Sequence, residues 1–369
     1  MDENPFVFGQ PVRGPAFIDR TAELERVRNY LKNGRSLIIY SPRKYGKTSL
    51  VLRAIDGFGG SVLPIFLDCY AFTSEHDLAR ALSAKVLAHY PEREILAAIK
   101  RLFAGITPKI TVKTAPEVEV GVEYEPEEDL SGAYDLPERL AVDRGRRVVV
   151  VFDEFQELAG FENLLKTLRS VFQHHQHVAY VFIGSKRHMM EWIFRSQESP
   201  FYNFGAHMTL HEIPAGAFAA YIGEAFAGAG IALLDGTVEA LLAATGCHPH
   251  YTQRLAFEVW YRGRIRGSAG PADVEAAIRE VIADLEGSYL AIWDALTANQ
   301  RRALLAVAQG EDDLFSGEFA RTRGFASPAS VQSALRRILE RGIAEEEGGG
   351  YRVADPFLAR WMEGRFLRG

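Results

Sequence analysis

Two kinds of apolar pattern alternate along the first 213 residues of the chain. Short continuous apolar runs, typical of strands buried on both faces, are separated by stretches whose apolar residues recur every three to four positions, as on amphipathic helices. The runs lie at 37–40, 61–69, 146–153, 178–183 and 208–213. Strands that alternate with helices in this way predict a doubly wound α/β fold with a parallel sheet.

Other stretches depart from this pattern. Residues 108–126 alternate apolar and polar at period two, which predicts a β-hairpin with one solvent-exposed face, inserted into the α/β core. Residues 214–288 are helical, and 289–369 read as three helices followed by two short strands around a glycine turn, which is a winged helix-turn-helix pattern. We therefore expect three parts: an α/β core over 1–213, a helical lid over 214–288 and a winged-helix domain over 289–369.

The first strand leads into Ser41-x-x-x-x-Gly46-Lys47-Thr48, and a helical pattern follows. This is the phosphate-binding P-loop pattern, with a serine where the pattern has its first glycine. Backbone N–H groups of such a loop wrap around phosphate oxygens, Lys47 would reach the β- and γ-phosphates, and the Thr48 hydroxyl would bind Mg²⁺. Serine is tolerated at 41 if its backbone angles stay in a region open to non-glycine residues. The expected cradle comprises Ser41, Pro42, Arg43, Lys44, Tyr45, Gly46, Lys47, Thr48 and Ser49.

A second motif supplies the chemistry that this loop needs. The apolar run at 146–152 ends in Asp153-Glu154, and a carboxylate at the carboxyl end of a buried parallel strand points into the crevice where α/β proteins bind ligands. Asp153 fits the acid on the Mg²⁺ side, and Glu154 fits the base that polarises the attacking water. Together the two motifs predict a P-loop NTPase core that binds a nucleoside triphosphate.

Two further positions have both a binding and a structural interpretation. Ser185, after the strand at 178–183, would contact the γ-phosphate or its water, with Lys186 and Arg187 as weaker candidates; the alternative is that Ser185 only caps the next helix. Pro249, at the start of a helix, would pack on a base; the alternative is a proline-capped helix of a bundle with no ligand.

Composition and charge are those of an ordinary globular protein. The 369 residues are 47% hydrophobic and 24% charged, and the net charge of −6 gives no global attraction to nucleic acid or membranes. No apolar run approaches the ~20 residues that span a bilayer, and the amino terminus lacks the basic and apolar regions of a signal peptide. We therefore expect a cytoplasmic protein. Cys69 and Cys247 have no metal-binding spacing, and His248 and His250 have no further ligand close in sequence.

The winged helix has two possible partners. Arg336, Arg337 and Arg341 on its third helix are placed to contact the phosphates of double-stranded DNA. Three glutamates at 345–347 lie in the wing, where basic residues would suit DNA contact better. These glutamates favour docking within the chain or on a protein partner over DNA binding, which stays the alternative.

Taken together, the motifs resemble the archaeal-type ATPases of the AAA+/STAND P-loop class, over nearly the whole chain. Beyond the P-loop and the acid strand, the resemblance rests on Asn4-Pro5-Phe6, Phe17-x-Asp19-Arg20-x-x-Glu23-Leu24, Gly184-Ser185, Gly246-x-x-Pro249 and Asp355-Pro356-Phe357. It implies an α/β ATPase core, a helical bundle that closes over the nucleotide, and a winged helix, with ATP and Mg²⁺ as ligands. It also implies that Phe17 and Arg20 lie near the nucleotide and that Pro249 approaches the adenine.

One stretch departs from the family pattern. Members often carry an arginine in the loop after the Ser185 strand, whereas residues 199–205 read Ser-Pro-Phe-Tyr-Asn-Phe-Gly. This puts in doubt an arginine-assisted step from that loop and leaves Arg187 and Arg195 as substitutes.

The sequence thus predicts an Mg²⁺-dependent ATPase that acts as a molecular switch, with nucleotide state controlling the arrangement of the helical and winged-helix parts. Two alternatives stay open: a DNA-binding regulator that uses the nucleotide as effector, and a scaffold that holds nucleotide without turnover. A protein partner and a homo-oligomer are also compatible with the sequence.

Overall fold

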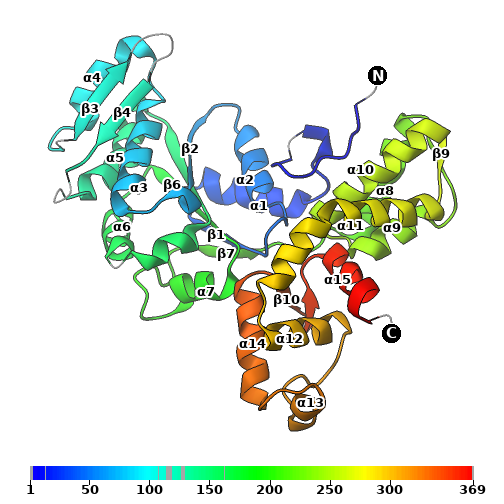
Figure 1. Ribbon diagram of the computed structural model, residues 1–369. Helices are drawn as coiled ribbons and strands as arrows, with labels where there is room; N and C mark the ends of the chain where they lie inside the picture. The colour runs from blue at the N-terminus through cyan, green and yellow to red at the C-terminus, as the bar shows by residue number, and fades with distance from the viewer. Residues whose placement is uncertain are drawn as a thin grey trace. The chain divides into compact units, whose positions relative to one another are not determined.

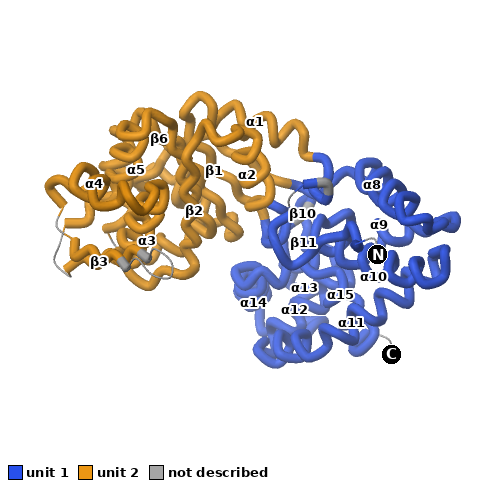
Figure 2. The backbone as a smooth tube through the Cα atoms, turned by 90° about the horizontal axis from the view of Figure 1, so that it is seen from above, with its two compact units in different colours: residues 1–19, 42–46, 211–369 blue, residues 20–41, 47–210 orange. Residues whose placement is uncertain are grey.

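The computed structural model describes residues 3–12, 14–106, 108–113, 119–125, 129–161 and 163–367 (Figure 1). The chain forms two compact units (Figure 2). The α/β unit comprises 20–41 and 47–210, and the helical unit comprises 1–19, 42–46 and 211–369. The P-loop is therefore divided, because its tip at 42–46 belongs to the helical unit.

A parallel five-stranded sheet forms the centre of the α/β unit, in the order β2-β5-β6-β1-β7. Its strands are β1 (Leu37–Tyr40), β2 (Val62–Asp68), β5 (Arg147–Asp153), β6 (Val178–Gly184) and β7 (Ala206–Thr209). The predicted parallel sheet is confirmed. The last strand begins at 206 and ends at 209, four residues before the predicted end at 213, because the backbone N–H of Leu210 donates to the Ser41 hydroxyl at 2.6 Å and leaves the ladder.

Helices flank this sheet. They are α1 (Thr21–Lys32), α2 (Lys47–Asp56), α3 (Glu75–Leu87), α4 (Glu92–Leu102), α5 (Ser131–Arg144), α6 (Leu164–Phe172) and α7 (Arg187–Arg195), with 3-10 turns η2 (Cys69–Ala71) and η3 (Phe155–Gly160). Between α4 and α5, strands β3 (Lys109–Lys113) and β4 (Glu119–Glu123) pair antiparallel. Val122 of this hairpin packs into the core of the unit, while the expected turn at 114–118 lies outside the described residues. One hydrophobic core thus joins sheet, helices and hairpin.

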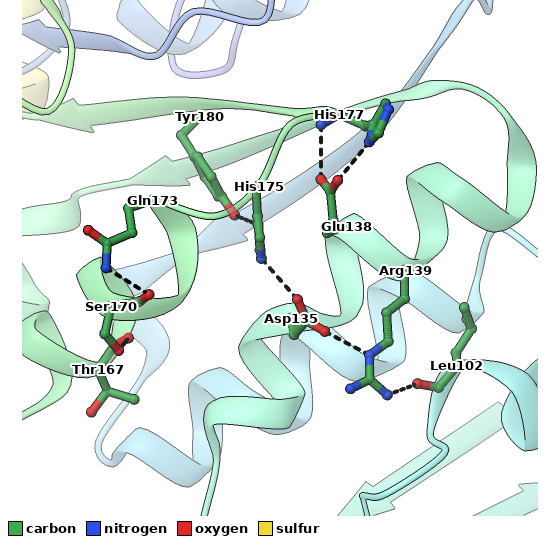
Figure 3. Close-up of polar contacts among 10 residues, drawn as sticks. All are labelled: Leu102, Asp135, Glu138, Arg139, Thr167, Ser170, Gln173, His175, His177 and Tyr180. Atoms are coloured by element: carbon green, nitrogen blue, oxygen red, sulfur yellow. Dashed lines mark hydrogen bonds and ion pairs between the residues drawn. The ribbon is translucent and has the colours of Figure 1, made fainter.

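A polar network ties α5 to the chain around the start of β6 (Figure 3). The buried His175 ring places Nδ1 2.5 Å from the Tyr180 hydroxyl and Nε2 3.2 Å from Oδ1 of Asp135. Arg139 Nε donates to the other Asp135 oxygen at 2.8 Å. The hydrogen bond from His175 and the contact with Arg139 outweigh burial and lower the pKa of Asp135 to about 2. Because its members are paired with one another, this cluster holds the fold together rather than offering an open site.

The helical unit contains eight α-helices and two short strand pairs among its described residues. The helices are α8 (Ala215–Gly228), α9 (Thr237–Thr245), α10 (Pro249–Arg266), α11 (Pro271–Asp294), α12 (Ala298–Ala308), α13 (Gly317–Thr322), α14 (Pro328–Glu340) and α15 (Pro356–Met362). The strands are β8 (Ala232–Leu233), β9 (Ser268–Ala269), β10 (Ala344–Glu347) and β11 (Gly350–Val353), and short turns η1 (Gly14–Ala16) and η4 (Glu363–Leu367) lie near the chain ends.

The predicted winged helix is present: α12, α13 and α14 precede the antiparallel β10–β11 wing. A single hydrophobic core runs from the amino-terminal Phe6 through α8–α11 to Met362. Helix α11 is continuous through position 288, where the sequence places a domain boundary. The helical and winged-helix parts are therefore packed as one body.

The amino-terminal segment is anchored on the helical unit. Phe6 packs against Tyr221 and Phe226, with ring centroids 5.5 and 5.8 Å away. The buried Gln253 of α10 accepts from the backbone N–H of Val7 at 3.2 Å and donates to the carbonyl of Ala16 at 3.3 Å. Within the described ranges, no helix is long and apolar enough to cross a membrane.

Candidate nucleotide site

The α/β unit brings together the P-loop residues that begin α2 and the acid that ends β5. Thr48 Oγ1 donates to Asp153 Oδ2 at 2.7 Å. The buried Lys47 extends its Nζ to the carbonyl of Ser41 at 2.7 Å. Burial raises the pKa of Asp153, and the hydrogen bond from Thr48 acts in the opposite direction. A hydroxyl, a carboxylate and an ammonium group thus converge where the P-loop enters its helix.

Ser41 replaces the first glycine of the pattern without a positive φ angle. Its hydroxyl donates to the Leu210 carbonyl at 2.7 Å and accepts from the Leu210 N–H at 2.6 Å. The side chain therefore joins the end of β1 to the chain after β7, which a glycine would not do. Gly46, by contrast, has φ 84°, a conformation that favours glycine.

Glu154 is held at the carboxyl ends of β5 and β6. Its Oε2 accepts from Ser185 Oγ at 2.6 Å and from the Ser185 backbone N–H at 3.3 Å. Ser185 does not cap α7, whose N-cap is Lys186, so the alternative interpretation of Ser185 as a helix cap is wrong. The serine instead orients the carboxylate that the sequence assigns to water activation.

The tip of the P-loop packs on helix α10 within the helical unit. The Tyr45 ring meets the His248 ring edge to face, with centroids 4.6 Å apart, and Lys44 Nζ lies 5.0 Å from the Tyr251 ring centroid. Burial lowers the pKa of His248 to about 3, so the ring is neutral and its Nδ1 accepts from the His250 N–H at 3.2 Å. No cluster of three or more potential metal-binding His, Cys, Asp or Glu side chains occurs in the described part of the chain.

The buried Tyr45 also reaches the wing. Its hydroxyl donates to Oε1 of Glu212 at 2.7 Å and accepts from Nη2 of Arg352 at 2.6 Å. Arg352 of β11 contacts Glu212 and donates from Nε to Glu345 of β10 at 2.6 Å. Glu345 Oε1 lies 3.3 Å from the Tyr45 hydroxyl. We call Tyr45, Glu212, Glu345 and Arg352 the wing cluster.

Protonation states in the wing cluster favour these contacts. Burial and the hydrogen bond to Glu212 raise the pKa of Tyr45, so the hydroxyl keeps its proton at neutral pH. Burial acts to raise the pKa of Glu212, but the hydrogen bonds from Tyr45 and Arg352 prevail and lower it to about 2. Burial raises the pKa of Glu345 against the effect of Arg352.

The other predicted ligand residues belong to different elements of the fold. Phe17 lies in the amino-terminal segment of the helical unit, next to the buried Ile18. Arg20, buried and with φ 65°, precedes α1 and pairs with Glu23 at 3.2 Å. Pro249 is the first residue of α10, as both interpretations of this position expect. Of the remaining cradle residues, Ser49 is buried, Pro42 is half-buried and Arg43 is exposed.

The loop at 199–205 contributes a side chain to the hydrophobic core of the α/β unit. Phe201 is fully buried and packs on Phe155, Phe182 and Phe194, with centroids 5.6 to 5.7 Å away. Of the two substitute arginines, Arg195 donates to the Tyr40 hydroxyl at 2.8 Å, and Arg187 pairs with Glu191 in α7.

All three winged-helix arginines are exposed, and two of them lie on α14. Arg336 and Arg337 lie 3.8 and 3.3 Å from the carboxylate of Glu340. Arg341 instead donates to the carbonyl of Ala295 at 3.1 Å and joins the end of α14 to that of α11.

Three residues of these networks were not predicted from the sequence: Gln156, Glu212 and Arg352. Gln156 is a fully buried amide that contacts Glu154. Its one sequence signal is a polar residue between the apolar Phe155 and Leu158. Glu212 and Arg352 carry no local signal, because their partners are distant in sequence.

A P-loop between the buried parallel strand β1 and helix α2, with a carboxylate at the end of β5 in the same sheet, defines a P-loop NTPase. The chain belongs to the family of ATPase domains found predominantly in Archaea, whose model matches residues 17–214. A second model, a probable winged helix domain, matches residues 287–364. No curated protein matches the chain by sequence.

Solved structures share this fold along the whole chain. A Walker-type ATPase of Pyrococcus abyssi superposes with a TM-score of 0.67 at 15% identity, covering 97% of this chain and 99% of the other. The ORC2 protein of Aeropyrum pernix, solved as ADPNP–ADP complexes, has a TM-score of 0.58 at 13% identity and covers 98% and 96%. The ORC1 protein of the same organism, solved with DNA, has a TM-score of 0.51 at 13% identity and covers 95% and 94%.

Proposed function

We propose that this protein is an Mg²⁺-dependent ATPase whose winged helix is coupled to the P-loop. The family supports ATP binding and hydrolysis as the activity. Mg²⁺ prefers hard oxygen ligands and in nucleotide sites takes few from the protein, the rest coming from phosphates and water. The Thr48 hydroxyl and the Asp153 carboxylate, 2.7 Å apart, are ligands of this kind. When bound, the ion would offset phosphate charge.

The side chains of the α/β unit have separate roles in this proposal. Lys47 leaves the Ser41 carbonyl and binds phosphate oxygens, and the free N–H groups at the start of α2 favour negative charge there. Glu154 orients and deprotonates the attacking water. Ser185 holds the carboxylate of Glu154 in place through Oγ.

The observation that carries the coupling is the position of the Tyr45 hydroxyl. One P-loop side chain contacts Glu212, which follows the last strand of the sheet, and Arg352, which belongs to the wing. Both hydrogen bonds have a charged partner, and such a bond contributes about 1.5–3 kcal/mol. A change in the position of the wing therefore alters the conformation of the phosphate-binding loop, and phosphate bound at the loop alters the position of the wing in return.

Replacing Tyr45 with phenylalanine should speed the release of bound ADP. The ring still packs on His248, but the hydroxyl contacts with Glu212 and Arg352 are lost. We expect release to become roughly 10-fold faster or more, which corresponds to the loss of about 1.5 kcal/mol or more for hydrogen bonds to charged groups. Stopped-flow fluorescence with a labelled ADP, in Mg²⁺ and in excess chelator, measures this rate and its metal dependence.

The matched control is Tyr261→Phe, because Tyr261 is exposed on α10 of the same unit. In an Arg352→Met background, Tyr45→Phe should have a smaller effect, because one of the two partners of its hydroxyl is already gone and only Glu212 remains. Equal release rates for Tyr45→Phe and Tyr261→Phe would refute the coupling. Unchanged ADP affinity on removing Mg²⁺ would refute the proposed role of the ion.

A second candidate function, DNA binding, is favoured by the exposure of Arg336 and Arg337 on α14, the third helix of the winged helix. The contacts of the wing favour docking within the chain, because Glu345 and Arg352 already bond to each other within the wing cluster. The proposed DNA surface is therefore α14 alone.

A double substitution Arg336→Ala with Arg337→Ala tests this surface. If each arginine contacts one phosphate, the slope of log affinity against log salt should become shallower by about 2, and affinity should fall on all sequences alike. Fluorescence anisotropy with labelled duplex DNA at several salt concentrations gives the slope. Arg279→Ala, an exposed arginine on α11, is the control. No binding by the unmodified protein at low salt would exclude this function.

A further inference from the structure

The site contains a buried amide whose role the proposed function does not assign. Gln156 belongs to η3, two residues after Glu154, and is 0% exposed. Its Nε2 donates to Glu154 Oε2 at 2.6 Å and to Glu157 Oε1 at 3.2 Å. The two hydrogens of the amide nitrogen are thus donated to two different carboxylates, one of Glu154 and one of Glu157. An amide between two acids lowers their mutual repulsion by giving each a donor.

The same network reaches the loop that follows β6. Glu157 Oε1 also accepts from Lys186 Nζ at 2.8 Å, and Glu154 Oε2 also accepts from Ser185. Ser185 and Lys186 are consecutive residues, so the chain of contacts runs from one to the other through Glu157, Gln156 and Glu154. The loops that follow β5 and β6 are therefore joined by side chains as well as by the sheet.

Packing leaves Gln156 little freedom to turn. A Cβ atom placed on Gly184 would lie 2.6 Å from Gln156 Oε1, so the glycine at the end of β6 makes room for the amide. Oε1 is buried and has no hydrogen-bond partner among the described residues. Turning the amide over would place this oxygen against two carboxylates, so the observed orientation is the favourable one.

The backbone conformation of Glu154 is a second reason why this residue needs contacts that hold it in place. Glu154 has φ 54° and ψ 44°, a left-handed conformation that costs a non-glycine residue roughly 1–2 kcal/mol. Such a conformation persists only where the surroundings hold it. The contacts of Gln156 and Ser185 with the carboxylate are among the interactions that do so, together with the hydrogen bond from the Glu154 backbone N–H to Asp153 Oδ1 at 3.1 Å.

We propose that Gln156 is a positioning residue, which holds the Glu154 carboxylate in the orientation for water activation and links that orientation to the Ser185–Lys186 loop. The inference rests on the proposed role of Glu154 as the base. Gln156 itself touches neither nucleotide nor water in this account. Misplacing a catalytic group by about 1 Å can cost on the order of 100-fold in rate, so the effect of losing the amide is measurable.

Two substitutions of similar size separate positioning from packing. Gln156→Met removes the donors, and Gln156→Glu replaces them with an acid. Both should lower kcat on the order of 10- to 100-fold while KM for ATP changes little, because the phosphate-binding residues are untouched. Gln173→Glu, at an exposed position in the same unit, is the matched control and should keep the full rate.

The pH profile gives a signature that packing alone would not. A glutamate at 156 would face two carboxylates in a buried place, so its own pKa would be raised. As pH falls through that pKa, the group gains a proton and donates a hydrogen bond again. The rate of Gln156→Glu relative to the unmodified protein should therefore rise toward acid pH, while that of Gln156→Met stays flat. Parallel profiles for the two variants, or a full rate for either, would overturn the proposal.

A measurement without turnover separates this inference from the proposed function. In a double-mutant cycle on unfolding, Gln156→Met and Glu154→Gln should be non-additive if the two side chains interact. If Glu154→Gln leaves hydrolysis intact, the proposed base is wrong while the cycle still reports the contact. If Glu154→Gln is inactive, the cycle is additive and Gln156→Met is fully active, the role of Gln156 is wrong and that of Glu154 stands.

Discussion

Replacing Glu154 with glutamine should leave ATP binding intact and slow hydrolysis by roughly 10²- to 10⁴-fold, the range in which a positioned general base contributes. The amide has nearly the shape of the carboxylate and can still contact Ser185. It cannot take a proton from water. Single-turnover hydrolysis of radiolabelled ATP, together with equilibrium binding of the same nucleotide, separates the two steps.

Glu198→Gln, an exposed glutamate of the same unit, controls for the change of charge. Hydrolysis at the normal rate by Glu154→Gln would remove Glu154 from the mechanism. A slow rate that is also shown by the unmodified protein, with bound ATP intact over hours, would instead favour the scaffold that holds nucleotide without turnover.

Replacing Lys47 with alanine should weaken ATP binding by at least ~100-fold. The buried ammonium would otherwise make charge-assisted hydrogen bonds to phosphate, each contributing about 1.5–3 kcal/mol. Its present contact is with the Ser41 carbonyl, in the same loop, so the substitution leaves the sheet and its core unchanged. Isothermal titration calorimetry with a non-hydrolysable ATP analogue measures the loss.

Lys166→Ala is the control, since Lys166 is exposed on α6. Lys47→Arg keeps the charge and tests whether the shape of the ammonium matters. Equal affinity in Lys47→Ala and Lys166→Ala would mean that phosphate does not bind at this loop, and the assignment of the P-loop would fail.

The local motifs could be predicted from the sequence because their signals are local. The P-loop needs a buried strand before it and a helix after it, and β1 and α2 are in those places. The apolar run at 146–152 indicates β5 with Asp153 at its end, since a short continuous run of β-branched residues is typical of a strand buried on both faces. The tolerance of serine at 41 also followed from a local condition, a backbone angle outside the positive region.

The order of the strands and the partners of the loop could not be predicted in this way. Periodicity shows that strands are parallel but not which of them are neighbours, so the position of β1 between β6 and β7 comes only from the fold. The interpretation of Ser185 as a cap was wrong for a related reason. A hydroxyl after a strand caps a helix or binds a carboxylate equally well, and the choice depends on where Glu154 lies.

By itself, the sequence determined that this chain has a P-loop at 41–49, an acid pair at the end of a buried strand and a winged helix in its last part, because the residues of each motif are close together in sequence. Only the tertiary structure decided what the loop is connected to. Ser41 meets Leu210 across 169 positions, and Tyr45 meets Arg352 across 307. Contacts over such distances depend on how whole elements pack, and packing is set by the sum of many weak interactions along the chain rather than by any pattern near the residues that touch.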